Sequence, residues 1–168
     1  MADAEGSLLS VRAIDLEMMA RVTLAFLLGG MIGYERESIQ RPAGLRTHML
    51  VAAGAAAFTL ASMYAFDGES PARDPTRIAA QIVTGVGFLG AGTIWRTPST
   101  IRGLTTAASI WLVAAVGLLA GSGMYLLAVF TTLGGFAALR WGRLAARRRR
   151  RPTGEPSITG DDDDKIVD

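Results

Sequence analysis

Residues 81–95 read Q-I-V-T-G-V-G-F-L-G-A-G-T-I-W, an apolar run interrupted by Gly85, Gly87, Gly90 and Gly92. Glycine inside a helix in water costs about 1 kcal/mol relative to alanine, so this run suits a water-exposed helix poorly. In a bilayer the backbone must stay helical, because no water is present to bond its polar groups. Small residues also let neighbouring membrane helices pack closely. The four glycines therefore predict a transmembrane helix that packs on both sides and is central to its bundle.

The same glycines match a dinucleotide-binding pattern, G-x-G-x-x-G, at Gly85, Gly87 and Gly90. That pattern indicates a nucleotide site only after a strand, at the start of a helix, and with an acidic residue about 20 positions later. Here the glycines lie within an apolar run, and the next acidic residue is Glu155. Helix packing is the better interpretation of these glycines.

The composition favours a membrane protein and narrows the available chemistry. Half of the 168 residues are hydrophobic, which is a high share for a soluble domain. The chain has no cysteine, which excludes disulfides and thiol nucleophiles, and its single histidine is His48. No nucleophile–base pair is evident, so we expect a protein that is not an enzyme.

The C-terminal segment differs in character from the rest of the chain. Residues 161–165 read D-D-D-D-K, an enterokinase recognition sequence, and contain the only lysine. We interpret residues 152–168 as a disordered tail derived largely from an expression tag. Without residues 157–168 the chain has 16 basic and 10 acidic residues, a net charge of +6 rather than +2.

Five apolar segments predict an all-α transmembrane bundle, since a span needs about 20 mostly apolar residues. They lie at about residues 16–34, 47–66, 77–95, 104–121 and 122–141, and a basic tail follows at 142–151. The only turn signal between the last two is Gly121-Ser122-Gly123, so these two should form a tight hairpin. Five spans place twelve of the sixteen arginines on one side, which puts the N-terminus outside and the C-terminus in the cytosol.

The basic tail ends in five consecutive arginines at residues 147–151. Such a run could form a specific site for anionic lipid or nucleic acid. We favour a stop-transfer anchor on the negatively charged inner leaflet, and expect no nucleic-acid partner.

Three sequence motifs, the second of which includes the glycine-rich run, occur in order along the predicted membrane part. They are G-x-x-I-G-Y-E-R-E with R-P-A-G-L-R-T-H at 29–48, D-x-x-R-I-A-A-Q-I-V-x-G-V-G-F-L-G-A-G-T-I at 74–94, and G-L-T-T-A-A-S-I-W at 103–111. Together they resemble the MgtC/SapB family of bacterial inner-membrane proteins over about residues 16–123. The resemblance implies a multi-pass protein of the cell membrane, associated with virulence, adaptation to low magnesium and intracellular survival.

A first polar cluster is expected near the outer face, comprising Arg21, Asp74, Arg77 and Gln81. Arg21 lies about one turn inside the first span, where a cation must either snorkel to the surface or find a partner. Asp74 is a candidate partner, although Asp74-Pro75 also reads as a helix N-cap followed by a first-turn proline.

A second polar cluster is expected at the inner ends of the spans. Its members are Glu35, Arg36, Glu37, Arg46, Thr47, Arg102, Thr105 and Thr106. The connection between the first two spans should be short and ordered, because Pro42-Ala43-Gly44 reads as a turn. Compensating ion pairs and a cytosolic ligand or partner site both explain this concentration of polar groups.

Two functions remain open at this point. Magnesium needs hard oxygen ligands, and the only weak candidates are Asp74, Glu35 and Glu37, since no span has an acidic residue at its middle. We therefore favour a non-enzymatic regulator that contacts other membrane proteins, and the resemblance implies the F-type ATP synthase among them. We also expect a homo-oligomer, first of all a dimer, in the lipid bilayer. The alternative is a magnesium transporter or channel, and Mg²⁺ is the one cofactor considered.

Overall fold

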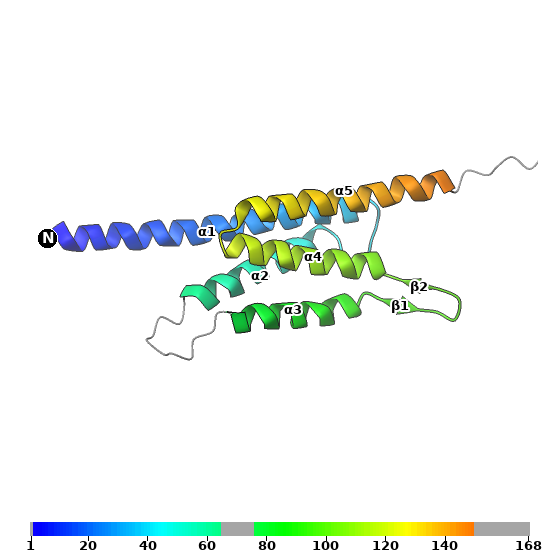
Figure 1. Ribbon diagram of the computed structural model, residues 1–168, viewed down its shortest axis with the longest axis horizontal. Coiled ribbons are helices and arrows are strands. Elements are labelled where there is room, and N and C mark those ends of the chain that lie inside the picture. Colours follow the sequence, from blue (N-terminus) through cyan, green and yellow to red (C-terminus); the bar gives the residue numbers. More distant parts are fainter. Residues whose placement is uncertain (1, 65–75, 150–168) are drawn as a thin grey trace, which may run out of the picture.

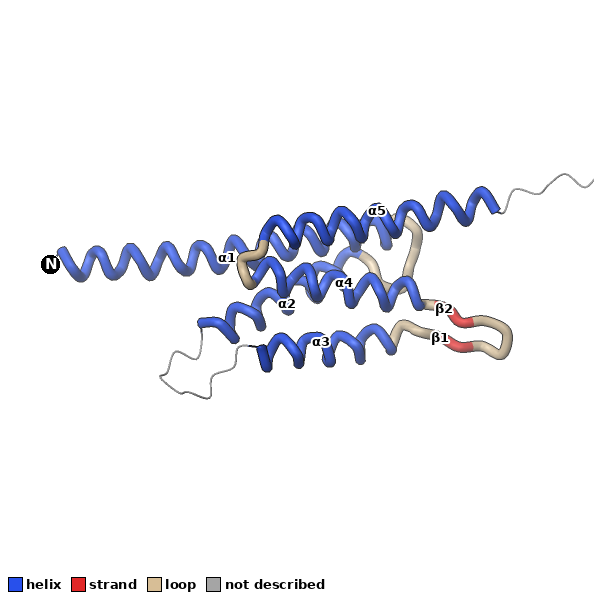
Figure 2. Tube along the Cα trace, viewed as in Figure 1, coloured by secondary structure: helices blue, strands red, loops and turns tan. Residues whose placement is uncertain are grey.

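The computed structural model describes residues 2–64 and 76–149, with side chains described for 12–64 and 76–142. Its five helices are α1 (Ala2–Glu37), α2 (Leu45–Tyr64), α3 (Thr76–Ala91), α4 (Leu104–Gly121) and α5 (Tyr125–Arg149). Between α3 and α4, the two-residue strands β1 (Trp95–Arg96) and β2 (Ile101–Arg102) pair in an antiparallel hairpin. The helices lie along one long axis (Figures 1 and 2), so the predicted helical bundle is confirmed. The hairpin was not predicted.

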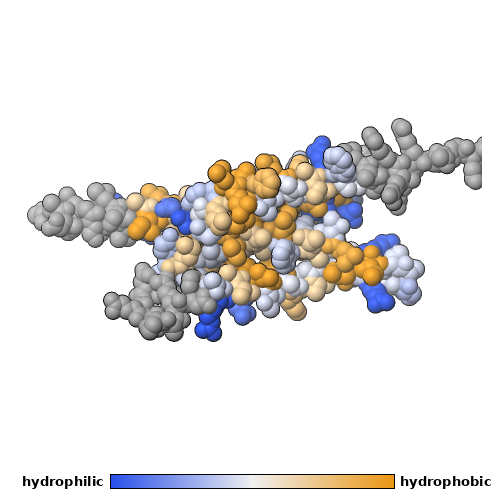
Figure 3. Space-filling view, viewed as in Figure 1, coloured by the Kyte–Doolittle hydropathy of each residue, from blue (hydrophilic) through white to orange (hydrophobic). Residues whose placement is uncertain are grey.

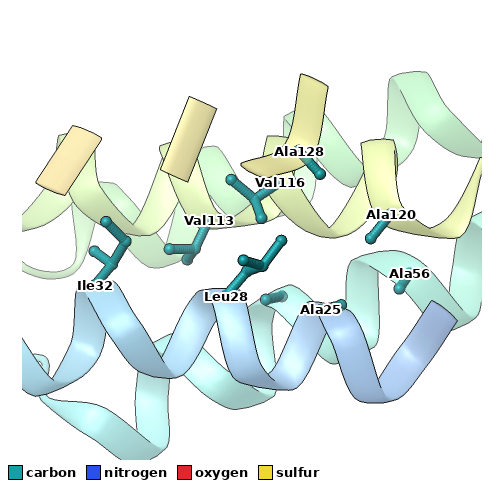
Figure 4. Packing of buried hydrophobic residues seen from close by; sticks show 9 residues of the cluster. Ala25, Leu28, Ile32, Ala56, Val113, Val116, Ala120 and Ala128 are labelled. Atoms are coloured by element: carbon teal, nitrogen blue, oxygen red, sulfur yellow. The ribbon is translucent and has the colours of Figure 1, made fainter. Parts of the chain in front are cut away.

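The interior of the bundle is rich in alanine, and many large apolar residues lie on the outside. Ala25, Ala56 and Ala120 belong to a buried cluster where α1, α2, α4 and α5 meet (Figure 4). On the outside, Leu126 is 89% exposed and Phe88 is 82% exposed, and apolar surface extends along the visible face (Figure 3). Water disfavours so much exposed apolar area, whereas lipid tails match it. This surface therefore fits a bilayer.

Three of the described helices are long and apolar enough to cross a membrane, by length and composition. They include Arg12–Glu37 of α1, Leu45–Tyr64 and Leu104–Gly121. Helix α3 is shorter, at 16 residues, and α5 becomes rich in arginine toward its end. Each of the five predicted spans nevertheless coincides with one helix over most of its length.

The central helix is α4, so the prediction that the glycine-rich segment is central was wrong. Helix α4 packs against all four other helices, whereas α3 packs substantially only on α2 and α4. Gly85 and Gly87 face open space within the chain, and Gly92 approaches only its own preceding turn. Gly90 alone of the predicted four lies at a helix crossing, where an added Cβ would be 3.6 Å from Ala107. The reason is that α3 buries Ile82 and Val86 against the bundle, and Gly90 is its only buried glycine.

The close helix crossings use two other glycine pairs, each with a spacing of four residues. Gly29 and Gly33 of α1 face the first half of α2, and Gly117 and Gly121 of α4 face its middle. A Cβ at Gly29 would lie only 2.7 Å from the Cβ of Ala52, which is closer than real Cβ atoms come. These G-x-x-x-G pairs therefore set the distance between α1, α2 and α4.

Candidate functional site

A network of buried polar side chains lies where α1 ends and where α2 and α4 begin. Glu35 and Arg36 come from α1, His48 from α2, and Thr106 and Ser109 from α4; all five are buried, and His48 is 0% exposed. Polar groups remain inside an apolar bundle only when they are paired. This network is thus the most polar part of the described core.

Two separate sets of contacts engage these side chains. The Arg36 guanidinium pairs with the Glu35 carboxylate. The His48 ring connects the first loop to α4, because Nδ1 lies 2.8 Å from the carbonyl oxygen of Gly44 and Nε2 lies 3.0 Å from the Ser109 hydroxyl. That hydroxyl also lies 2.8 Å from the carbonyl oxygen of Thr106. His48 therefore joins the start of α2 to α4, across 61 positions of the sequence.

The loop between α1 and α2 is an ordered turn, as predicted from Pro42-Ala43-Gly44. The Leu45 amide donates a hydrogen bond of 2.7 Å to the Glu37 carboxylate. A carboxylate at this place satisfies a free amide at the start of α2 and lies at the positive end of the helix dipole. The Arg41 amide also donates to the Arg36 carbonyl oxygen, at 3.1 Å. Glu37 thus fixes the loop against the start of α2.

The predicted inner cluster separates into a buried part and an exposed part. Glu35, Arg36 and Thr106 belong to the buried network described above. The exposed members are Glu37, Arg46, Thr47, Arg102 and Thr105. The predicted inner cluster is therefore partly buried and partly exposed.

Sequence reasoning missed Ser109 and the connecting role of His48. The available signal was the spacing of Thr106 and Ser109, which lie three residues apart and so share one face of an apolar helix. Two hydroxyls on one face indicate a polar partner on the neighbouring helix. The sequence alone does not say that this partner is His48.

At the opposite end of the bundle, Arg21 joins α1 to the turn between α4 and α5. Its guanidinium pairs with Glu17 one turn earlier and donates a hydrogen bond of 2.9 Å to the carbonyl oxygen of Gly121. It also lies 5.9 Å from the ring centroid of Tyr125. Because Gly121 ends α4, its carbonyl lacks a partner within the helix and attracts a cation. Arg21 therefore caps α4.

The remaining residues of the predicted outer cluster are separate from Arg21 or not described. Asp74 lies outside the described residues, so its pairing with Arg21 stays a prediction. Arg77 and Gln81 are exposed on α3, which packs on α2 and α4 rather than on α1. Gln81 instead lines an apolar groove of about 660 Å³ between α2 and α3, together with Phe58 and Leu89.

The acidic residues in the described inner region are engaged within the protein. Glu35 pairs with Arg36, and Glu37 binds the start of α2. Among the side chains described, those of residues 12–64 and 76–142, no group of three or more His, Cys, Asp or Glu is placed to hold a metal ion. The arrangement is that of a packed polar network beneath an exposed rim with several arginines.

Comparison with known proteins identifies close relatives of this chain. A model of the MgtC family matches residues 22–148. The chain is 48% identical over 118 residues to "Putative magnesium transporter YhiD" of Escherichia coli strain K12, covering 68% of this chain and 55% of that protein. It is 56% identical over 100 residues to Protein MgtC of Brucella abortus strain 2308, covering 60% of this chain and 40% of the relative.

A further relative is Protein MgtC of Salmonella typhimurium, with 53% identity over 109 residues, covering 65% of this chain and 45% of the relative. The chain spans about half the length of the curated relatives it matches. No solved structure is a significant match.

Proposed function

This chain belongs to the MgtC family, and on that premise we propose that it is a regulatory membrane protein that acts through contacts with partners and catalyses no reaction. Its place is the bacterial inner membrane, which it crosses several times. The partners are other membrane proteins, with the F-type ATP synthase as the first to test, and a second copy of the chain.

The proposed topology has five spans, with the N-terminus outside and the C-terminus in the cytosol. The α1–α2 loop and the β hairpin lie at one end of the bundle, and the α4–α5 turn lies at the other (Figure 1). Arg36, Arg41, Arg46, Arg96 and Arg102 therefore gather at one end. An excess of arginine in short loops marks the cytosolic side, so this end is assigned to the cytosol.

The observation that carries the proposal is that buried, paired polar groups and exposed arginines lie next to each other at this cytosolic end. The Glu35 carboxylate is buried against Arg36, and the His48 ring is buried against Ser109. The neighbouring side chains of Arg41 and Arg46 are exposed on the ordered loop and on the first turn of α2. Exposed guanidinium groups on a rigid base suit recognition of acidic groups on a partner.

A second candidate function is magnesium transport, which the printed name of the Escherichia coli relative favours. Magnesium is bound by one or two carboxylates together with retained waters. In the described inner region, Glu35 would have to exchange Arg36 for the ion, and Glu37 would have to release the start of α2. Both exchanges disrupt contacts that hold the fold, which is why transport ranks second.

Partner capture tests the regulatory proposal. We expect Arg41→Ala with Arg46→Ala to reduce co-purification of the F-type ATP synthase by about tenfold, since charge pairs across an interface contribute 1.5 kcal/mol or more. Abundance and thermal stability should not change, because both side chains are exposed. The matched control is Arg77→Ala, an exposed arginine on α3. Equal capture by the double variant and the control would reject this surface as the partner site.

A further inference from the structure

The β hairpin is a compact, rigid projection between α3 and α4. It extends past the ends of these helices (Figures 1 and 2). At its tip, the Thr97 amide donates to the Thr100 carbonyl oxygen at 2.9 Å, and the two threonine hydroxyls lie 2.9 Å apart. At its base, Gly103 has a φ of 90° and passes so close to the Thr93 carbonyl that no Cβ would fit. The hairpin is therefore fixed at both ends.

Each face of the hairpin combines one apolar and one cationic side chain. Trp95 is opposite Arg102, and Arg96 is opposite Ile101. Residues directly opposite in an antiparallel pair point to the same face. Trp95 is 64% exposed and Ile101 is 55% exposed, and both arginines are exposed as well. Figure 3 shows apolar and strongly hydrophilic surface side by side at this end of the molecule.

The position of the hairpin relative to the bilayer follows from the chain itself. Arg102 is separated by one residue from Leu104, the first residue of the candidate span Leu104–Gly121. The hairpin therefore lies at the level where α4 leaves the hydrocarbon, which is the headgroup region. Tryptophan is enriched at this level, and guanidinium groups there are attracted to anionic lipids.

We propose that the hairpin is an interfacial anchor that binds the headgroups of anionic phospholipids. Arg96 and Arg102 bind the phosphate groups, while Trp95 and Ile101 insert among the glycerol and upper acyl groups. The charge of the two guanidinium groups complements the charge of the lipid, and the apolar side chains match its depth. The proposal is independent of the partner surface at Arg41 and Arg46.

Fluorescence quenching of a single tryptophan tests this anchor. The full chain with Trp111→Phe and Trp141→Phe retains Trp95 alone and is reconstituted into bilayers of mixed lipid. In one set the minority lipid is phosphatidylglycerol brominated high on the acyl chain, and in the other it is phosphatidylcholine brominated at the same carbons. We expect brominated phosphatidylglycerol to quench Trp95 at least about twofold more strongly than brominated phosphatidylcholine at equal mole fraction.

Arg96→Gln with Arg102→Gln should remove this lipid preference while Trp95 remains quenchable, because the apolar side chains still insert. The matched control, Arg41→Gln with Arg46→Gln, removes the same charge from the same end and should leave the preference intact. A variant that retains only Trp111, which is exposed on α4, should be quenched without regard to the headgroup.

Three outcomes would overturn the anchor. Trp95 that is quenched by aqueous iodide but not by brominated lipid would place the hairpin in water, free for a protein partner. Equal quenching by the two brominated lipids would reject anionic recognition. A preference that survives the arginine substitutions would reject the assigned residues. None of these results bears on capture of the ATP synthase, so failure of the anchor and failure of the regulatory role are distinguishable.

Discussion

His48 shows, at the scale of one residue, how the buried network holds the bundle together. Its ring contacts the carbonyl oxygen of Gly44 in the first loop and the hydroxyl of Ser109 on α4. Losing the ring would remove one hydrogen bond from each of these groups and would create a cavity. Both effects destabilise folded proteins.

We therefore expect His48→Ala to lower the free energy of unfolding by about 2–4 kcal/mol, from lost packing and lost hydrogen bonds. Thr47→Ala, at the exposed neighbouring position, is the control and should change stability by less than about 0.5 kcal/mol. Thermal unfolding in detergent micelles compares the two variants. Similar unfolding temperatures would show that the network is not a stabilising element.

At the scale of elements, the crossing of α4 over α2 determines how tightly the bundle packs. Gly117 meets the carbonyl of Ala52 so closely that no Cβ would fit, and an added Cβ at Gly121 would lie 2.7 Å from the Ala56 carbonyl oxygen. Any larger residue must push the two backbones apart. Overpacking of this kind costs about 1–3 kcal/mol or more in tightly packed cores.

We expect Gly117→Ala to destabilise the protein by at least about 2 kcal/mol, because the clash is with backbone. Gly54→Ala on α2 is the matched control, since an added Cβ there meets nothing within 4 Å. Gly87→Leu on α3 should also leave the stability of the single chain nearly unchanged, because Gly87 is exposed and an added Cβ there meets nothing within 4 Å. If Gly87→Leu were as damaging as Gly117→Ala in denaturation experiments, the assignment of α4 as the central helix would be wrong.

The helices were predictable from the sequence, but their packing was not. The Gly121-Ser122-Gly123 turn is confirmed, with Gly123 at a φ of 83°, because turn chemistry is local. The face of α3 that meets the bundle depends on contacts with α2 and α4, which a pattern of small residues does not specify. Arg21 contacts a carbonyl 100 residues away, so its partner could not be read from neighbouring residues. The short hairpin strands carried too little alternation to be recognised.

At the scale of the whole molecule, the absence of cysteine makes the proposed topology directly testable. We expect a cysteine introduced as Arg41→Cys to react with a membrane-impermeant reagent only after the cells are permeabilised. Arg12→Cys, near the other end of α1, should react in intact cells. Both positions are exposed. Labelling of position 41 in intact cells would contradict the orientation. The same labelling result at positions 12 and 41, before and after permeabilisation, would argue against a crossing by α1.

The central claim, regulation rather than transport, depends on where the carboxylates are. The Glu35 carboxylate pairs with Arg36, and the Glu37 carboxylate accepts a hydrogen bond from the Leu45 amide at the start of α2. The most direct measurement is magnesium uptake into proteoliposomes that contain the purified chain and a magnesium-sensitive dye. We expect uptake at the level of empty liposomes, both for the unaltered chain and for Glu35→Gln. Saturable uptake by the unaltered chain, abolished by Glu35→Gln in protein that remains folded, would contradict the regulatory role and establish transport.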